Sequence, residues 1–344
     1  MKRSAVIAAI AALLFAVTLS AQTTPTITPS SGPTAGGTEV ILKGEFPTFP
    51  SDVYFGGVPA LSTQRIDATT IKVVTPPHLP GPSRLTVFDY DMFVDLGLNF
   101  QFAGDPPPSY EAILLPLLIP PVHGAFGSEF HVDFRAAARG AGAARIYGLE
   151  PSCPLGVLCV PRELGDELLD PNSVGGELEP DSIKYNGTPG RIIYVPANDL
   201  QNLVLNLRVY DVTRDDQNFG TELPAIRVRD FDPKRIVLTG VPGDPRFRNT
   251  LRIYGATEST VKVTIGNGAP SEVHLQRAAN DIFTPASATL TLPGTTDDSF
   301  RVTIEAEGVD TPVLPIPLPI WAFISVTNND TQMITTITPQ PRGN

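Results

Sequence analysis

Residues Thr26–Phe46 read TITPSSGPTAGGTEVILKGEF and place four glycines around one short apolar run. A phosphate-binding loop has the order strand, glycine-rich turn and helix, with a Lys or Ser/Thr at a set position. Here the order is reversed, because the apolar run follows the glycine-rich turn. Val40 and Leu42 alternate with Ile41 and Lys43, which is the period of a β-strand. The stretch therefore predicts a turn that leads into a strand, with glycines for positive φ and close backbone approach.

Short strand-like runs continue along the chain, separated by Gly, Pro, Asn and Asp. From Phe300 to Ala306, apolar side chains take every second position and polar ones take the positions between. The run from Leu203 to Val209 has the same pattern, and the 36 prolines and 29 glycines suit many turns. The one helical candidate, within residues 161–170, is one or two turns long. The sequence therefore predicts an all-β fold of tandem β-sandwiches with immunoglobulin-like architecture.

Proline-containing segments divide the chain into pieces of domain size. The stretch GDPPPSYE, Gly104–Glu111, is typical of a stiff and extended linker. The stretch RDFDPKR, from residue 229, is a weaker boundary. Together they predict three domains at residues 23–105, 109–231 and 232–344, each the size of one β-sandwich.

Four motifs follow one another in the first of these domains. They are PTITPSSGPTAGGTEVILKGEF from Pro25, VYFGGVPA from Val53, TTIKVVTPP from Thr69 and RLTVFD from Arg84. In this order they resemble the IPT/TIG family of immunoglobulin-like domains over residues 24 to 104. The resemblance implies a seven-stranded sandwich that contacts proteins or glycans, or spaces other domains, and that is not usually catalytic. The segment DYDMFVDLGLNFQF departs from the family by being longer and more acidic, which predicts an elaborated edge.

The N-terminus has the layout of a secretory signal peptide. Two basic residues precede an apolar run, Ala5–Val17, and small residues follow as far as Ala21. We expect residues 1–21 to form the leader, with cleavage after Ala21 or else after Ser20. The run is short for a membrane span, with an uncleaved anchor as the alternative, and no later apolar stretch reaches about 18 residues. The sequence predicts an exported protein (extracellular, cell-surface or periplasmic) with no membrane span in the mature chain.

Charge narrows the expected partners. The chain has 36 acidic and 25 basic residues and a formal net charge of −11. An acidic surface repels nucleic acid and anionic lipid, and no Lys/Arg cluster offsets this charge locally. The composition therefore argues against a nucleic-acid partner, and we expect a protein or glycan on the cell exterior.

The two cysteines, Cys153 and Cys159, lie in one proline-flanked loop. In an exported chain this spacing predicts a local disulfide, with a contribution on the order of 2 kcal/mol. A redox motif has two residues between its cysteines rather than five. A metal site needs more ligands than this loop supplies.

Oxygen-bearing side chains gather in one loop before Gly220: Asp211, Asp215, Asp216 and Asn218. Calcium takes six to eight oxygen ligands, often from such loops. A second, smaller group of acids comprises Asp89, Asp91 and Asp95. Neither spacing matches a complete EF-hand loop, and hairpin turns have the same composition. A calcium site and an acidic turn both stay open here, and no other cofactor is expected.

The search for catalytic residues assigns none. The four histidines form no paired metal motif, and His131 and His274 alternate with apolar residues as on a strand face. The segment PVHGAFGSEF contains Ser128, but a hydrolase elbow needs G-x-S-x-G between a strand and a helix. Here Gly127 directly precedes the serine, and a strand follows. We predict that the protein is not an enzyme, with a carboxylate pair from distant strands as the remaining catalytic alternative.

Trp321 is the single tryptophan and lies between apolar neighbours, which favours a core position over a sugar-stacking platform. The sequence thus supports a secreted, non-catalytic interaction or structural protein, such as an adhesin or spacer of Ig-like domains. The alternative hypothesis is a carbohydrate-binding module, with or without calcium.

Overall fold

The computed structural model describes part of the chain between residues 25 and 339. The segments outside that part are both termini and residues 47–51, 57, 90–91, 119–120, 140–143, 149–166, 170–173, 176–189, 214–219, 279–281 and 310–315. The described residues form β-strands and short 3-10 helices, and no α-helix. The predicted all-β class is therefore confirmed. The predicted leader, residues 1–21, and the predicted disulfide between Cys153 and Cys159 lie outside the described residues.

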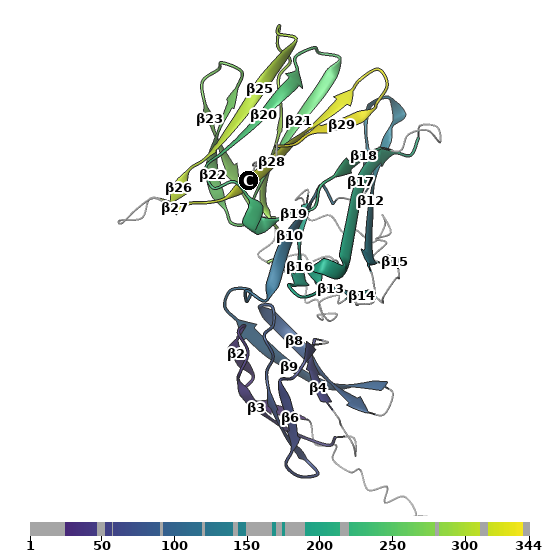
Figure 1. Ribbon diagram of the computed structural model, residues 1–344, viewed down its shortest axis with the longest axis vertical. Coiled ribbons are helices and arrows are strands. Elements are labelled where there is room, and N and C mark those ends of the chain that lie inside the picture. Colours follow the sequence, from purple (N-terminus) through teal and green to yellow (C-terminus); the bar gives the residue numbers. More distant parts are fainter. Residues whose placement is uncertain are drawn as a thin grey trace, which may run out of the picture. The chain divides into compact units, whose positions relative to one another are not determined.

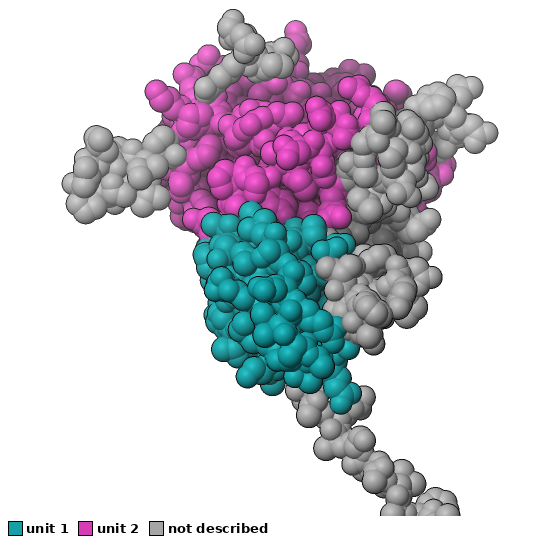
Figure 2. Space-filling model, turned by 60° about the horizontal axis from the view of Figure 1, so that its bottom comes forward, with its two compact units in different colours: residues 1–104 teal, residues 105–344 magenta. Residues whose placement is uncertain are grey.

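The chain divides into two compact units, residues 1–104 and residues 105–344 (Figure 2). Unit 1 is a β-sandwich of two sheets. One sheet has the order β1 (Thr26–Thr28), β3 (Glu39–Lys43), β7 (Thr70–Val74) and β6 (Ser62–Arg65). The other has the order β2 (Ser31–Pro33), β9 (Met92–Ala103), β8 (Gly81–Asp89), β4 (Asp52–Phe55) and β5 (Val58–Pro59). The consecutive strands β1 and β2 thus belong to different sheets.

The glycine turn leads into β3, as the sequence predicts. Val40 and Leu42 are buried and Lys43 is exposed. Gly36 has a φ of 75°, and a Cβ atom there would come within 2.5 Å of the carbonyl carbon of Pro76. Only glycine satisfies both constraints, so this turn serves the packing of the sandwich.

Aromatic rings fill the core of unit 1. Phe55, Phe100 and Phe102 are buried and meet edge to face, with ring centroids between 4.9 and 6.0 Å apart. The ring of His78 stacks on Phe102 at 4.6 Å, and its Nδ1 lies 2.9 Å from the carbonyl oxygen of Leu79. Burial disfavours the charged imidazolium, so the pKa of His78 lies below its ordinary value of 6.5. His78 is therefore part of the core of unit 1.

Residues 105–231, the first half of unit 2, hold a short sheet and a longer one. The short sheet has the order β16 (Gly190–Pro196), β10 (Tyr110–Pro116) and β19 (Ile226–Arg227). The longer one has the order β11 (Val122–His123), β12 (Glu129–Ala138), β17 (Leu203–Asp211) and β18 (Thr221–Leu223), and β15 (Val174–Gly175) pairs with β12. The remaining described elements are β13 (Ala144–Ile146), β14 (Glu167–Leu169), η1 (Ala125–Gly127), η3 (Leu200–Asn202) and η4 (Val228–Asp230).

Residues 232–344, the second half of unit 2, hold two four-stranded sheets around one core (Figure 1). The first has the order β20 (Arg235–Pro242), β25 (Ser299–Ala306), β22 (Ser259–Ile265) and β23 (Ser271–Leu275). The second has the order β24 (Ala286–Thr291), β21 (Phe247–Gly255), β28 (Ile320–Asn328) and β29 (Ile334–Ile337). A small pair comprises β26 (Gly308–Val309) and β27 (Ile316–Pro317).

The predicted boundary at residues 231 and 232 falls between η4 and β20, inside unit 2. Because both halves belong to one compact unit, the division of the chain into three domains stays a prediction. Among the described residues, no helix is long and apolar enough to cross a membrane.

Candidate binding cleft

Strand β28 is buried on both of its faces. Successive side chains of a strand point to opposite sides of the sheet. One face joins the core of the second half of unit 2 through Ile320, Ala322, Ile324 and Val326. The opposite face is also buried and carries Trp321, Phe323, Ser325 and Thr327. The first half of unit 2 lies against this opposite face, and β18 runs beside β29 at its edge (Figure 1).

At one end, this interface is closed by aromatic packing. Trp321 and Phe323 pack with Tyr254 of β21, whose ring is parallel to that of Phe323 at 6.4 Å. Gly190 of β16 lies against the same tyrosine, because a Cβ atom there would come within 2.8 Å of the Tyr254 Cε1. Trp321 is 6 % exposed, which confirms the predicted core position and leaves no open ring for a sugar to stack on.

Beyond Phe323 the interface opens into a cleft of about 340 Å³. The wall from the first half of unit 2 is largely apolar and includes Leu117, Val122, Phe130, Val132, Val209 and Leu223. The wall from β21, β28 and β29 is largely polar and includes Arg248, Thr250, Arg252, Ser325, Thr327 and Thr336. Clefts of a few hundred Å³ with mixed lining are the usual sites for small ligands.

Two arginines stand on the polar wall. Arg248 and Arg252 are four residues apart on β21, so both point to the same side of the sheet. Arg252 donates a hydrogen bond from Nη1 to Ser325 Oγ at 2.8 Å, and its guanidinium carbon lies 5.7 Å from the ring centre of Phe323. Arg248 takes part in none of the ion pairs between described residues.

The cleft is locally positive in an acidic protein. No Asp or Glu occurs among the described residues that line it, although the chain carries a net charge of −11. Walls of low dielectric around charges of one sign focus their field into a cleft. The two arginines therefore favour an anionic group in this cleft.

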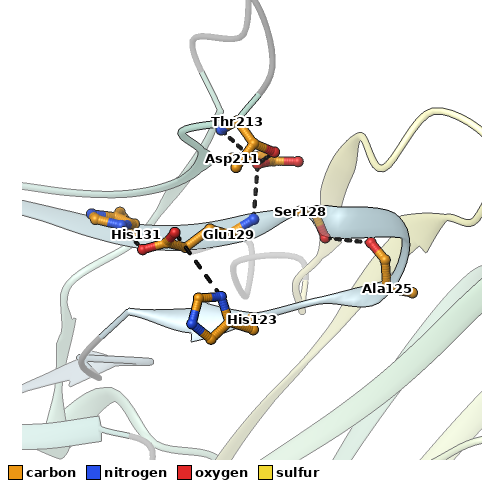
Figure 3. A network of polar contacts seen from close by, with 7 residues as sticks. All are labelled: His123, Ala125, Ser128, Glu129, His131, Asp211 and Thr213. Carbon is orange, nitrogen blue, oxygen red and sulfur yellow. Dashed lines mark hydrogen bonds and ion pairs between the residues drawn. The ribbon is translucent and has the colours of Figure 1, made fainter.

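The turn between β11 and β12 forms part of the rim (Figure 3). Ser128 is buried, and its hydroxyl donates to the carbonyl oxygen of Ala125 at 2.8 Å. It also lies 3.4 Å from Oε1 of Gln332, in the hairpin between β28 and β29. Gln332 has a φ of 58° and donates from Nε2 to the carbonyl oxygen of Asn329 at 2.6 Å. Ser128 thus lies at a contact between the two halves of unit 2 at the rim.

A row of polar contacts continues from this turn along β12 (Figure 3). His131 Nε2 lies 2.9 Å from Oε1 of Glu129, and His123 Nδ1 lies 4.0 Å from the other carboxylate oxygen. The His123 side chain is 86 % exposed. The strand-face position predicted for His131 is thus confirmed, and its carboxylate neighbour makes it part of a polar row.

The predicted calcium ligands are only partly described. Asp211 is buried, and its Oδ1 accepts hydrogen bonds from the backbone N–H of Glu129 at 3.1 Å and from the backbone and hydroxyl of Thr213 at 3.0 and 2.7 Å. These contacts give Asp211 the role of an Asx cap on the end of β17. Asp215, Asp216 and Asn218 lie outside the described residues. No group of three metal-binding side chains occurs in the described part of the chain, and the calcium site stays a prediction.

The second acidic group has one member with described contacts. Asp95 forms an ion pair with Arg84 across β8 and β9, and it accepts a hydrogen bond from the backbone N–H of Gly97 at 2.9 Å. Asp91 lies outside the described residues, as does the side chain of Asp89. The contacts of Asp95 fit an ordinary turn and strand pair.

Sequence reasoning did not predict the cleft. Two patterns in the sequence are nevertheless consistent with the cleft. The segment IWAFISVTN has no alternation of apolar and polar residues at its start, as expected of a strand covered on both sides. The segment RFRNTLRIYG places Arg248, Thr250 and Arg252 on alternate positions, which puts all three on one sheet face.

The family comparison concerns unit 1. Residues 23–102 match the family model described as the IPT/TIG domain. The resemblance read from the glycine turn is therefore confirmed for this part of the chain. No curated protein matches the chain significantly. The IPT/TIG domain thus accounts for unit 1, and unit 2 has to be interpreted from its own geometry.

Solved structures with similarity to the chain include three bacterial proteins. The Gamma-CGTase of alkalophilic Bacillus clarkii is 16 % identical over 59 % of this chain and 24 % of its own, with a TM-score of 0.19. The surface glycan-binding protein PbSGBP-B of Prevotella bryantii is 10 % identical, with coverage of 92 % and 99 % and a TM-score of 0.20. The SGBP-B of the Bacteroides ovatus mixed-linkage glucan utilization locus, in complex with a heptasaccharide, is 14 % identical, with coverage of 80 % and 71 % and a TM-score of 0.17. The chain spans about a quarter of the first of these proteins, and TM-scores this low support no functional argument.

Proposed function

We propose that this chain is an exported, non-catalytic binding protein of Ig-like β-sandwich domains that takes its ligand into the cleft of unit 2. The observation that carries the proposal is the lining of the cleft. A largely apolar wall faces a wall of hydroxyl and guanidinium groups. Small-molecule sites combine apolar lining with a few fixed polar groups in this way.

The ionisable side chains at the cleft support a binding role rather than a catalytic one. Glycoside hydrolysis uses two carboxyl groups about 5 to 10 Å apart, and none of the described lining residues supplies one. His123 is the histidine among the described lining residues, and its side chain is largely in solvent. The carboxylate of Glu129, beside His123, lies 2.9 Å from His131 Nε2.

In this proposal, the IPT/TIG domain spaces or presents unit 2 and offers further contact surface. The outer face of its β1–β3–β7–β6 sheet carries the ion pair of Lys72 and Glu39, with Nζ 2.7 Å from Oε1. Both side chains are partly in solvent, so that face meets water. The ligand site is therefore assigned to unit 2.

A carbohydrate is the second, more specific candidate ligand. A sugar ring has an edge of hydroxyl groups and faces of C–H groups, and the two walls of the cleft match these two surfaces. The hydroxyls of Thr250, Ser325 and Thr327 both donate and accept hydrogen bonds. The C–H faces would lie against the valine and leucine side chains opposite.

The test introduces a bulky side chain into the cleft from the edge strand β29. Thr336 lines the cleft from β29, whereas its neighbour Thr335 points to the other side and is exposed. We expect Thr336→Trp to abolish binding on a glycan array and Thr335→Trp to preserve it, with the chain used from residue 22 onward. A reducing-end assay on the bound glycan should show no product.

Two results contradict the proposal. Binding that survives in Thr336→Trp places the ligand elsewhere, and product release on the bound glycan makes the chain an enzyme. Far-ultraviolet dichroism and the melting temperature of both variants establish that the tryptophan has not unfolded unit 2.

A further inference from the structure

We infer that the cleft of unit 2 selects an anionic saccharide, whose carboxylate or sulfate group is held by Arg248 and Arg252. This inference rests on the proposed function, since it specifies the ligand of the same cleft. It starts from a contrast of charge within one molecule. The chain has 11 more acidic than basic residues, yet the described lining residues include two arginines and no carboxylate.

The chemistry of arginine fits oxyanions. Its planar guanidinium presents parallel N–H donors that match the two oxygens of a carboxylate or sulfate group. Arg252 is oriented before any ligand binds, because it bonds to Ser325 and lies over the ring of Phe323. Pre-orientation lowers the entropy cost of binding.

The spacing of the two arginines favours a ligand of several units. Their Cα atoms are four residues apart on one strand, which corresponds to about 13 Å. A short acidic oligosaccharide carries acidic groups on successive units and can place one near each arginine. Thr250 lies between them on the same face, with a hydroxyl for the sugar between the acidic groups.

The opposite wall favours a saccharide over other anions. Val132, Val209 and Leu223 present aliphatic side chains to the cleft, which suit the C–H face of a sugar ring. An acidic peptide lacks the C–H face and serves as a comparison ligand.

The experiment compares matched ligands by isothermal titration. The first pair is trigalacturonate and its methyl ester, which differ in charge but share a backbone. The second is a sulfated carrageenan tetrasaccharide and its desulfated form. A pentaglutamate peptide is the fifth ligand. We expect at least about tenfold tighter binding of the charged member of one pair, because its uncharged counterpart loses the charge-assisted hydrogen bonds to arginine. The pair that shows this preference identifies carboxylate or sulfate.

Matched variants test whether Arg248 binds the charged group of the saccharide. Arg248→Gln is expected to weaken binding of the charged saccharide about tenfold and to leave its uncharged counterpart nearly unchanged. Arg248→Lys keeps the charge without the paired donors and should lie between. Arg301→Gln is the control, because Arg301 is exposed on β25, which does not line the cleft. Added NaCl should weaken the charged ligand only.

Three outcomes overturn the inference. They are equal affinity for charged and uncharged members of both pairs, an Arg248→Gln variant that binds as tightly as the parent, and pentaglutamate that binds as well as the saccharides. If uncharged sugar binds and Thr336→Trp abolishes that binding, the proposed function stands while this inference fails. If no acidic saccharide binds, this inference fails, and the array result for Thr336→Trp decides the proposed function separately.

Discussion

Strands β3 of unit 1 and β28 of unit 2 are both interior strands of four-stranded sandwich sheets. Their inner faces are alike, with Val40 and Leu42 in one core and Ile324 and Val326 in the other. Their outer faces differ. β3 ends in an exposed Lys43, whereas β28 keeps Phe323 buried on the outer side.

The difference shows how one sandwich architecture yields a framework in one place and a site in another. In unit 1, the outer face of the sheet meets water and carries an ion pair. In unit 2, a second set of strands covers the corresponding face. Aromatic rings of that face pack together at one end, and a cleft with one apolar and one polar wall lies at the other. The candidate site is therefore a product of packing between the halves of unit 2.

The strongest test of this contrast removes a ring from the covered face. We expect Phe323→Ala to destabilise unit 2 by about 3–5 kcal/mol, because a fully buried aromatic side chain is lost and a cavity remains. The matched change in unit 1 is Ile41→Ala, on the half-buried outer face of β3, with an expected cost of about 1 kcal/mol.

The measurement is urea unfolding of the full chain. Trp321 is the single tryptophan and belongs to unit 2, so its fluorescence measures the loss in Phe323→Ala, while hydrogen exchange of unit 1 peptides in urea measures the loss in Ile41→Ala. If Phe323→Ala costs no more than Ile41→Ala, the outer face of β28 is not held by the first half of unit 2, and the contrast between the strands fails.

A smaller effect is expected where the halves of unit 2 touch through a glycine. Gly190 has a φ of 136°, and an added Cβ atom would come within 2.8 Å of the Tyr254 ring. Gly190→Ala should cost about 1–3 kcal/mol from backbone strain, with a further penalty for the moved tyrosine. Gly37→Ala, at a φ of 81° in open space, carries the backbone strain alone and is the control.

Equal losses in Gly190→Ala and Gly37→Ala would show that Tyr254 yields freely and that the aromatic end of the interface is loosely packed. A larger loss in Gly190→Ala, seen in the tryptophan transition, than in Gly37→Ala, seen by hydrogen exchange of unit 1 peptides in urea, ties the stability of unit 2 to contact between its halves.

The strands were predictable because their signal is local. The alternation around Val40 and Leu42, and the reversal of the glycine-loop order before them, are properties of adjacent residues. The resemblance to the IPT/TIG domain also rested on short motifs in sequence order. These signals are enough for an all-β fold and for unit 1.

The cleft depends on contacts between residues far apart in the sequence. Ser128 and Gln332 meet at its rim across 204 residues, and no local period encodes such a pair. The same holds for Trp321, whose apolar neighbours predict burial but not which element covers it. Arg248 and Arg252 look like ordinary strand-face residues until the first half of unit 2 is placed against them.

The smallest expected effect is a pH dependence of the stability of unit 1 that comes from His78. The folded His78 has a lowered pKa because burial penalises its charged form, whereas the unfolded chain protonates near the ordinary value of 6.5. Below pH 6.5 the unfolded chain therefore binds more protons than the folded one. Unit 1 should be most stable above pH 6.5 and lose stability as the pH falls from 6.5 to the lowered pKa.

Hydrogen exchange of backbone amides, followed by mass spectrometry at pH 7.5 and pH 5.5, measures this loss in peptides of unit 1 after correction for the intrinsic rate. His78→Gln removes the titrating group and should flatten the pH dependence, while His274→Gln, on an exposed position of β23, should leave it unchanged. A dependence that persists in His78→Gln assigns the acid sensitivity of unit 1 to its carboxylates. His78 would then contribute to packing only, and its protonation would not explain the acid sensitivity of unit 1.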